Sequence, residues 1–426
     1  MSITLTEEPR SFTQKRQKLI YFGSSSNVSQ TGFKYGVSVD VTASPNPIKY
    51  YIDKNPSGYF VFDLASTIRD RINIDVEDAA TGGVIHSLPH ASDKFMSVGT
   101  KGCVQFVVGF FEVYGDPLVE QPTLLVDVPI LLSGGFNIRD GFKPELTDYE
   151  PDGNTKKAFL TERVRINGEV RIKASEQDYG TLSFLNDSGT YISSGATKLR
   201  YRIYNSVGLQ GTEVFTITTT YGTQLPSAVD AAGKLTYFGA FPANVNDSNH
   251  GVSTGFKPED ITDWTYYTWE LLDDSLNVMS EPLYIDNTAN PCKHESVNLA
   301  WANNLGAWDY WRFDARTKRS IKTTRKEYQK SVGDYSGSSW SMNAYDRETK
   351  PYHVDSKLLF ELQSESLSSE ESDYIKNVMT SDNVMMYIDN QWLPVNVTNN
   401  SLSFQKEPIS NRLVTNLSVE LAQTEC

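Results

Sequence analysis

Apolar and polar residues alternate with a period of two along most of the chain, which is typical of β-strands with one buried face. Lys198–Tyr204 and Leu413–Leu421 are examples, and the aromatic-rich runs Tyr59–Phe62 and Trp264–Leu272 are strand candidates as well. Clusters of Gly, Pro, Ser, Asn and Asp separate these runs and are expected to form turns. The pattern therefore predicts a mainly β protein of several consecutive β-sandwich-like domains with a few short helices.

Two segments have the apolar spacing of an α-helix instead. In Asp63–Asn73, apolar residues recur every four positions, and Asp63 is expected to cap the helix at its N-terminus. In Ser368–Met379, Ser368 is followed three residues later by Glu371, which is the pattern of a capping box. We expect one short helix at each place.

The length of the chain indicates more than one domain. A chain of 426 residues is too long for one core, because domains usually hold about 100–200 residues. Gly, Asp, Pro and Glu dominate residues Gly135–Gly153, so we place a boundary there. The predicted domains are residues 1–150, with an extended arm at 1–16, then 151–295 and 296–426.

The stretch from Ser296 to Lys330 joins an aromatic hairpin to a basic segment. Two predicted strands flank a turn at Asn303–Gly306, where glycine can adopt the positive φ that tight turns often require. Aromatic residues fall on both faces of the second strand, so neither face is expected to be in water. We expect a subunit interface built from aromatic and basic residues: Trp301, Trp308, Tyr310, Trp311, Phe313, Arg316, Lys318, Arg319, Lys322, Arg325 and Lys326.

The charge of the whole chain bears on what the basic segment binds. The formal net charge is −14, from 39 Lys and Arg against 53 Asp and Glu, so most of the surface repels nucleic acid and anionic membranes. The basic segment can pair with the acidic surface of a neighbouring copy, or it can bind nucleic acid with Tyr328 stacked on a base. The acidic composition favours the first interpretation. Similarly, Trp264, Tyr266, Tyr267 and Trp269 form either a sugar-binding platform or ordinary core packing.

The sequence contains no pattern typical of a catalytic, cofactor or metal site. His86 and His90 are four residues apart, but Pro89 argues against the helix that a zincin motif needs. No P-loop, dinucleotide fingerprint or nucleophile elbow is found. The three cysteines form neither a disulfide framework nor a metal knuckle, and no apolar run is long enough to cross a bilayer. We therefore expect no enzyme, no cofactor and no membrane partner.

Three stretches carry short patterns that are similar to those of a known family. The first is Trp-x-Asn-x-Leu-Gly-x-Trp-Asp-Tyr, here Trp301, Asn303, Leu305, Gly306, Trp308, Asp309 and Tyr310. The second is a Gly-x-Phe-x-Phe-Asp-Leu step within Lys54–Ile72, and the third is Ser381–Val395. All three resemble virion proteins of tailed bacteriophages that infect Bacteroidetes, including the crAss-like phages. The resemblance implies a structural protein of the tail, neck or baseplate without catalytic residues.

We therefore expect a virion structural subunit that is made in the host cytoplasm and assembles into a ring or collar of the tail or neck. Its expected partners are other copies of itself and other tail or neck proteins. One alternative is a receptor-binding or carbohydrate-binding tail adhesin that contacts host surface glycan through the residues around Ser336–Tyr352. A polysaccharide-degrading tail enzyme is a further alternative, although the sequence favours no acid/base pair for it.

Overall fold

The structure is a computed structural model that describes residues 2–9, 12–40, 47–78, 81–92, 94–105, 107–126, 130–135, 146–163, 165, 167–185, 196–217, 235–288, 295–399, 404–406 and 413–423. The predicted mainly β class, with sandwich-like sheets and a few short helices, is confirmed. The longest α-helix among the described residues, α3 (Ser369–Ile375), has 7 residues. The four example strands above are confirmed within a residue or two.

Contacts divide the chain into two compact units. Unit 1 comprises Met1–Asn290, Ala300–Tyr310 and Thr380–Asp382, and unit 2 comprises Pro291–Leu299, Trp311–Met379 and Asn383–Cys426. Within unit 1, β7 (Met96–Val98) pairs with β17 (Leu235–Gly239), so residues on both sides of position 150 share one sheet. The division into residues 1–150, 151–295 and 296–426 stays a prediction.

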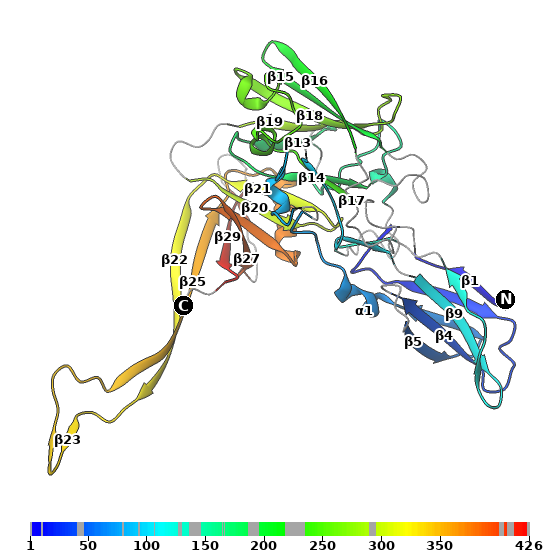
Figure 1. Cartoon of the computed structure of the whole chain (residues 1–426), viewed down its shortest axis with the longest axis horizontal. Helices are drawn as coiled ribbons and strands as arrows, with labels where there is room; N and C mark the ends of the chain where they lie inside the picture. Colours follow the sequence, from blue (N-terminus) through cyan, green and yellow to red (C-terminus); the bar gives the residue numbers. More distant parts are fainter. Residues whose placement is uncertain are drawn as a thin grey trace. The chain divides into compact units, whose positions relative to one another are not determined.

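The first part of unit 1 is a sandwich of two sheets. One sheet has the order β1 (Ile3–Glu7), β3 (Ile20–Ser25), β6 (Tyr59–Asp63), and the other has the order β10 (Val119–Glu120), β9 (Val107–Tyr114), β4 (Lys34–Asp40), β5 (Ile48–Asp53), with β11 (Leu124–Val126) also paired to β9. Figure 1 shows β4, β5 and β9 side by side. Phe60 on β6 packs on Phe110 of β9 with ring centroids 5.5 Å apart, which joins the two sheets through the core.

The helix expected after β6 is present but shorter than predicted. It consists of α1 (Ala65–Ile68) followed by the 3-10 turn η1 (Arg69–Arg71). The predicted N-cap is wrong, because Leu64 occupies that position and Asp63 ends strand β6. The Asp63 carboxylate still accepts a hydrogen bond from the Ala65 N–H at 3.1 Å, so it stabilises the first turn from one residue further back.

The rest of unit 1 is built from three further sheets. A five-stranded sheet has the order β13 (Val170–Ala174), β19 (Leu283–Asn287), β18 (Trp264–Leu272), β15 (Lys198–Asn205), β16 (Gly208–Thr216). The other two have the orders β14 (Thr181–Leu185), β17, β7 and β2 (Phe12–Gln14), β12 (Ile130–Leu132), β8 (Cys103–Gln105). Phe238 on β17 meets Trp269 on β18 edge to face at 5.1 Å, so the five-stranded sheet and the β14–β17–β7 sheet share a core.

Short helical turns complete unit 1: η2 (Ile85–Ser87), η4 (Thr147–Tyr149), α2 (Pro242–Asn246) and η5 (Pro258–Asp260). No helix in the described part of the chain is long and apolar enough to cross a bilayer.

Most strands of unit 2 belong to an eight-stranded sheet, which also includes residues 300–302 and 308–310 of unit 1. Its order is β21 (Trp308–Phe313), β20 (Val297–Ala302), β26 (Val384–Ile388), β27 (Gln391–Val397), β29 (Leu413–Leu421), β25 (Thr349–Gln363), β22 (Thr317–Gln329), with β28 (Phe404–Lys406) also paired to β29. The helix predicted at Ser368 is confirmed as α3 followed by η6 (Lys376–Thr380). Its capping box is present, because the Ser368 hydroxyl accepts from the Glu371 N–H and the Glu371 side chain accepts from the Ser368 N–H.

Strands β22 and β25 form a long antiparallel hairpin, which we call the arm (residues 317–363). Their pairing runs from Thr317 opposite Leu362 to Gln329 opposite Thr349. The third strand, β29, pairs only with Leu359–Gln363 of β25, so residues 321–358 form a two-stranded ribbon. A small hairpin of β23 (Asp334–Ser336) and β24 (Ser339–Ser341) lies at its end, and Figure 1 shows the ribbon in yellow and orange reaching that tip. The paired part from Ile321 to Gln329 is about 30 Å long.

Candidate functional site

Most aromatic residues of the predicted interface are buried within the chain. Trp301, Trp308, Tyr310 and Phe313 are all buried, with at most 6% of their surface exposed. Trp311 is half-buried, and its ring lies 6.1 Å from that of Tyr374 in unit 2. Both faces of the strand are covered, as its composition predicts. The interface role of these five residues stays a prediction, and the exposed surface in this region belongs to the basic residues.

The polar ends of two of these buried residues, Trp308 and Tyr310, are satisfied inside unit 1. The Trp308 Nε1–H donates to the Asp75 carbonyl at 2.7 Å. The Tyr310 hydroxyl lies 2.7 Å from His86 Nδ1 and accepts from the Thr181 N–H at 3.0 Å. These contacts assign the two side chains a role in holding distant segments of unit 1 together.

Asp309 lies between these two residues and is also buried. Its carboxylate accepts from the Thr161 hydroxyl at 2.5 Å and from the Glu162 N–H at 3.1 Å. Burial raises its pKa because the charged form loses its hydration, and these two hydrogen bonds act in the opposite direction. Both hydrogen-bond donors belong to neighbouring residues of one segment, so the Asp309 carboxylate anchors the segment around Thr161.

The turn between β20 and β21 is fixed by Asn303 and Gly306. The Asn303 side-chain oxygen accepts from the Leu305 and Ala307 N–H groups at 3.0 and 2.9 Å, and its amide donates to the Leu160 carbonyl. Gly306 has a φ of 89°, which confirms the predicted need for glycine. The Trp-x-Asn-x-Leu-Gly-x-Trp-Asp-Tyr pattern therefore encodes a turn and its buried contacts.

The basic residues nearest the base of the arm have acidic partners. Lys318 lies 3.1 Å from Glu361, and Arg319 lies 2.8 Å from Glu295. The Arg319 guanidinium also lies over the Phe360 ring at 5.7 Å. These pairs stabilise the start of the ribbon only modestly, because exposed ion pairs typically contribute about 0–1 kcal/mol.

Farther along the ribbon the basic residues are not neutralised. Lys322, Arg325 and Lys326 are exposed and form no ion pair with any residue that the structure describes. Arg316, which directly precedes β22, is exposed as well. These four residues keep their charges available to a partner.

The pairing of the two strands also places like charges opposite each other. Lys322 lies opposite Lys357, which also pairs with Glu420 at 2.8 Å. Alternate residues of a strand share a face, so Lys318, Lys322 and Lys326 line one side of the ribbon. Like charges in directly opposed positions are destabilising. The sequence does not reveal that Lys322 and Lys357 are opposed, because they are 35 residues apart.

Large apolar and aromatic side chains are exposed on the same ribbon. Ile321 is 65% exposed, and at the tip Trp340 is 51%, Met342 58% and Tyr345 81% exposed. Trp340 is nevertheless held in place, because its Nε1–H donates to the Val332 carbonyl at 3.0 Å. Three of these four exposed side chains fall within residues 340–345 of the tip, and such a concentration of exposed apolar residues is a feature of interaction surfaces.

The glycine beside Trp340 makes this packing possible. Gly333 has a φ of 86°, and a Cβ at this position would approach the indole to within 2.6 Å. Any other residue would therefore displace the tryptophan. The tip is thus a defined structure with an exposed aromatic surface.

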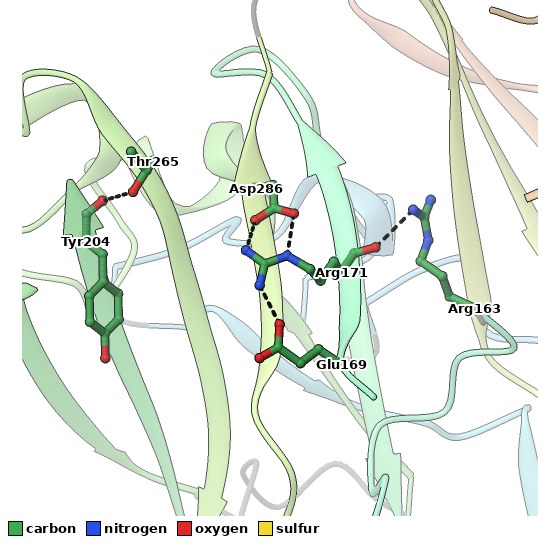
Figure 2. Close-up of polar contacts among 6 residues, drawn as sticks. All are labelled: Arg163, Glu169, Arg171, Tyr204, Thr265 and Asp286. Carbon is green, nitrogen blue, oxygen red and sulfur yellow. Dashed lines mark hydrogen bonds and ion pairs between the residues drawn. The ribbon is translucent and has the colours of Figure 1, made fainter. Parts of the chain in front are cut away.

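A second surface combines arginine and tyrosine on the five-stranded sheet. Figure 2 shows the Arg171 guanidinium donating to both oxygens of Asp286, at 2.6 and 2.9 Å, and to Glu169 at 2.6 Å. The Tyr284 ring lies 4.4 Å from the guanidinium carbon. The bond to Asp286 is the main cause of a raised pKa of Arg171. The Arg171 guanidinium is already bonded to two carboxylates of the same chain, which favours a structural role.

The aromatic strand β18 does not form the sugar-binding platform considered above. Trp264, Tyr267 and Trp269 are buried, and the Trp269 Nε1–H and the Tyr267 hydroxyl both donate to the Ala240 carbonyl. Tyr266 alone is half-exposed, and it stacks on Tyr204 at 4.6 Å. Core packing, the other interpretation, accounts for the three buried residues.

Unit 1 contains a cavity of about 370 Å³ beside the segment that Asp309 anchors. Its apolar lining includes Tyr149, Phe159 and Pro282. The charged residues on its lining are Lys157, Glu162, Arg163, Arg165 and Glu281. The Lys157 ammonium lies 5.3 Å from the centre of the Tyr149 ring, and Arg165 is paired with Glu281. The lining thus combines aromatic surface with three cations and two carboxylates.

The described residues contain no cluster of three or more His, Cys, Asp or Glu side chains that suits a metal ion. His86 is buried against Trp308 and Tyr310, whereas His90 Nε2 lies 2.8 Å from the Val84 carbonyl. The expectation of no enzyme and no cofactor stays a prediction.

No protein-family model matches the chain, and no curated protein sequence matches it.

Proposed function

We propose that this chain is a structural subunit of a bacteriophage virion, which assembles into a ring or collar of the tail or neck through protein–protein contacts. The observation that carries the assembly role is the arm: a two-stranded ribbon with unneutralised basic residues and exposed aromatic residues. Its proposed partners are other copies of the chain and other tail or neck proteins.

The physics of a two-stranded ribbon supports a bound state for the arm. A hairpin without a third strand or a packed face is marginally stable in water. Residues 321–358 have neither, since β29 pairs only with the base of β25. A partner that covers the exposed apolar surface would supply the missing stabilisation.

Charge complementarity favours a second copy as that partner. The arm, residues 317–363, holds nine Lys and Arg against six Asp and Glu, whereas the rest of the chain holds 30 against 47. The arm of one subunit is therefore attracted to the acidic remainder of another. Contacts between two different surfaces of identical subunits form closed rings when the rotation between subunits closes.

The assignment to a phage tail or neck rests on the resemblance of three sequence patterns. Two of these patterns encode local structure. One forms the β20–β21 turn at Asn303–Gly306, and the other forms the step from β6 to α1. The same resemblance supports the proposal that the assembled protein is part of the virion.

Shortening the arm tests the proposal directly. Replacing residues 323–356 by Asn-Gly joins Lys322 to Lys357, which already lie opposite each other, through a two-residue turn. The pairing of Leu359–Gln363 with β29 is kept, so the fold of unit 2 is retained. Native mass spectrometry at low salt should show an oligomer for the wild type and a monomer for the shortened chain. A monomeric wild type, or a shortened variant that still oligomerises, would contradict the proposal.

Reversing the arm's charge provides a second test with a matched control. Lys322→Glu, Arg325→Glu and Lys326→Glu together should abolish oligomerisation, because the arm then repels the acidic surface. The control reverses three exposed lysines of unit 1, Lys54, Lys94 and Lys101, and changes the net charge equally. Its oligomer should persist. Equal effects of the two variants would show that only net charge matters.

The second candidate function is a receptor-binding or carbohydrate-binding adhesin. The exposed aromatic residues Trp340, Tyr345 and Tyr352 favour it, since aromatic faces suit sugar rings. This function predicts binding of the full chain to host surface glycans, which is lost in Trp340→Ala. A glycan array probed with the wild type and this variant separates the two functions.

A further inference from the structure

We infer that Tyr345, at the tip of the arm of one copy, inserts into the unit 1 cavity of a second copy. This inference rests on the proposed assembly function and specifies the contact that the assembly uses. The cavity and the tip match each other in size, in chemistry and in charge.

The tip presents Tyr345 as a protruding and supported side chain. It is 81% exposed, the highest value among the aromatic residues that the structure describes. The turn that carries it is closed by the Asn343 N–H, which donates to the Asp346 carboxylate at 2.8 Å, and by the Asp346 N–H, which donates to the Asn343 carbonyl at 3.0 Å. A side chain on a preformed turn loses little conformational entropy on binding.

The cavity has the chemistry that a phenol ring needs. Tyr149, Phe159 and Pro282 provide apolar and aromatic packing, and Lys157 and Arg165 provide cations that favour the face of a further ring. Glu281 and Glu162 place acceptors on the same lining for the phenol hydroxyl. The volume of about 370 Å³ is near the lower end for ligand sites, so it suits one aromatic side chain better than an extended ligand.

The charges of the two surfaces have opposite signs. Residues 333–348 of the tip hold Asp334, Asp346 and Glu348 against Arg347 alone. The cavity lining has three cations and two carboxylates. The tip is therefore the acidic part of a basic arm, whereas the cavity lining carries one more cation than carboxylate within an acidic unit. Of these cations, Lys157 also pairs with Asp148 at 3.5 Å and Arg165 pairs with Glu281. This local inversion favours a second copy over a partner that matches only the arm's overall charge.

Photo-crosslinking from position 345 tests the contact. The full chain is made with p-benzoylphenylalanine in place of Tyr345, mixed with an equal amount of isotope-labelled chain that contains the same substitution, and irradiated at low salt. We expect mixed-label crosslinks to peptides that contain residues 157–165 or 281–283. Crosslinks that map elsewhere, that join only residues of the same chain, or that do not form would overturn the inference.

Two substitutions quantify the same contact by sedimentation velocity. Tyr345→Ala should weaken self-association about tenfold or more, as expected for an aromatic anchor. Tyr352→Ala, which removes another exposed tyrosine of the arm, should change it less than about twofold. Val170→Phe, which narrows the cavity from its β13 side, should weaken association as Tyr345→Ala does, and combining the two should add little further loss.

These measurements separate failure of this inference from failure of the proposed function. If the shortened arm abolishes oligomers but Tyr345→Ala and Val170→Phe do not, the assembly function stands and the Tyr345 contact is wrong. If the shortened arm leaves the oligomer intact, the proposed function itself is wrong. Circular dichroism of each variant confirms that the loss of association does not result from unfolding.

Discussion

Trp308 and Trp340 occupy opposite environments, and the same substitution should lower stability far more at Trp308 than at Trp340. Trp308 is 3% exposed and donates to the Asp75 carbonyl, whereas Trp340 is 51% exposed at the tip of the arm. Trp308→Ala should lower the free energy of unfolding of unit 1 by about 3–5 kcal/mol, because it leaves a large cavity. Trp340→Ala should lower stability by less than about 1 kcal/mol. Urea denaturation of both variants measures this difference.

Two buried histidines should make stability fall in acid. Burial lowers the pKa of His86 to about 3 and that of His250 to about 3, because a charged imidazole would lose its hydration. His250 also has the hydrogen bonds of a neutral ring: Nε2 lies 3.0 Å from the Gly239 carbonyl, and Nδ1 accepts from the Val252 N–H at 3.2 Å.

The direction in which stability changes with pH follows from proton linkage. The unfolded chain binds more protons than the folded chain between about pH 6.5 and pH 3, so stability decreases as the pH falls through this window. Each histidine contributes at most about 1.4 kcal/mol per pH unit. His250→Gln should reduce the slope of unfolding free energy between pH 6 and pH 4 by about this amount. Equal slopes in the two proteins would contradict the prediction.

Individual residues were predictable where a short-range rule applies. Gly306 and Ser368 follow such rules, because a tight turn and a capping box involve only neighbouring residues. The position of Tyr266 relative to Trp264 and Tyr267 depends instead on which face of β18 packs against β17. A sequence pattern alone does not decide that, since both faces of β18 carry aromatic residues.

The arm is the element that the sequence predicted least well. Its basic residues were identified, but not the 13-residue strand that they form or its pairing with β25. Strand prediction relies on alternation between a buried and an exposed face. β22 is exposed on both faces over most of its length, so TKRSIKTTRKEYQ shows no such alternation. In contrast, β29 alternates between more and less buried residues and β18 is buried over most of its length, and the bounds of both strands were predicted correctly.

Lys322→Glu should strengthen the free arm while weakening assembly. The substitution replaces a like-charge pair with Lys357 by an opposite-charge pair, which favours the ribbon by about 0.2–1 kcal/mol. Amide hydrogen exchange in the distal half of β22 should therefore become slower in the isolated subunit. Sedimentation velocity should show weaker self-association. If the stability of the ribbon and the strength of self-association both increase or both decrease, Lys322 has no separate role in binding.

Ser368→Ala should destabilise unit 2 through helix α3. The Ser368 hydroxyl accepts from the Glu371 N–H at 3.1 Å, and the Ser368 N–H donates to the Glu371 carboxylate at 2.9 Å. Losing the hydroxyl should lower the free energy of unfolding by about 0.5–2 kcal/mol. Ser369→Ala, one residue further on, is the control and should have little effect. Thermal denaturation followed by circular dichroism compares the two variants.

At the scale of the whole molecule, the mainly β class was predictable because alternation recurs in almost every segment. The arrangement of the sheets was not. β7 and β17 are about 140 residues apart, yet they are paired. The cavity similarly joins residues 149–170 with residues 281–283. Such contacts depend on the complete fold, so a single sequence does not reveal them.

Salt should loosen the assembly of the whole molecule. The proposed contact pairs a basic arm with an acidic remainder, and the Debye length shrinks from about 10 Å at 0.1 M salt to about 3 Å at 1 M. The dissociation constant of the wild type should therefore rise steeply with NaCl concentration. The variant with Lys54, Lys94 and Lys101 reversed should keep that slope, because its arm is unchanged. A slope near zero in the wild type would exclude an electrostatic contact.

The arm also determines which subunits survive a protease. Arg319, Lys322, Arg325 and Lys326 are exposed cleavage sites for trypsin-like enzymes. A ribbon with few tertiary contacts opens easily to a protease. We therefore expect an unassembled subunit to be cut first at the arm, and the proposed assembly to shield that site. In the assembly that we propose, a cut in β22 disrupts the binding element, so a nicked subunit should enter the ring less readily than an intact one.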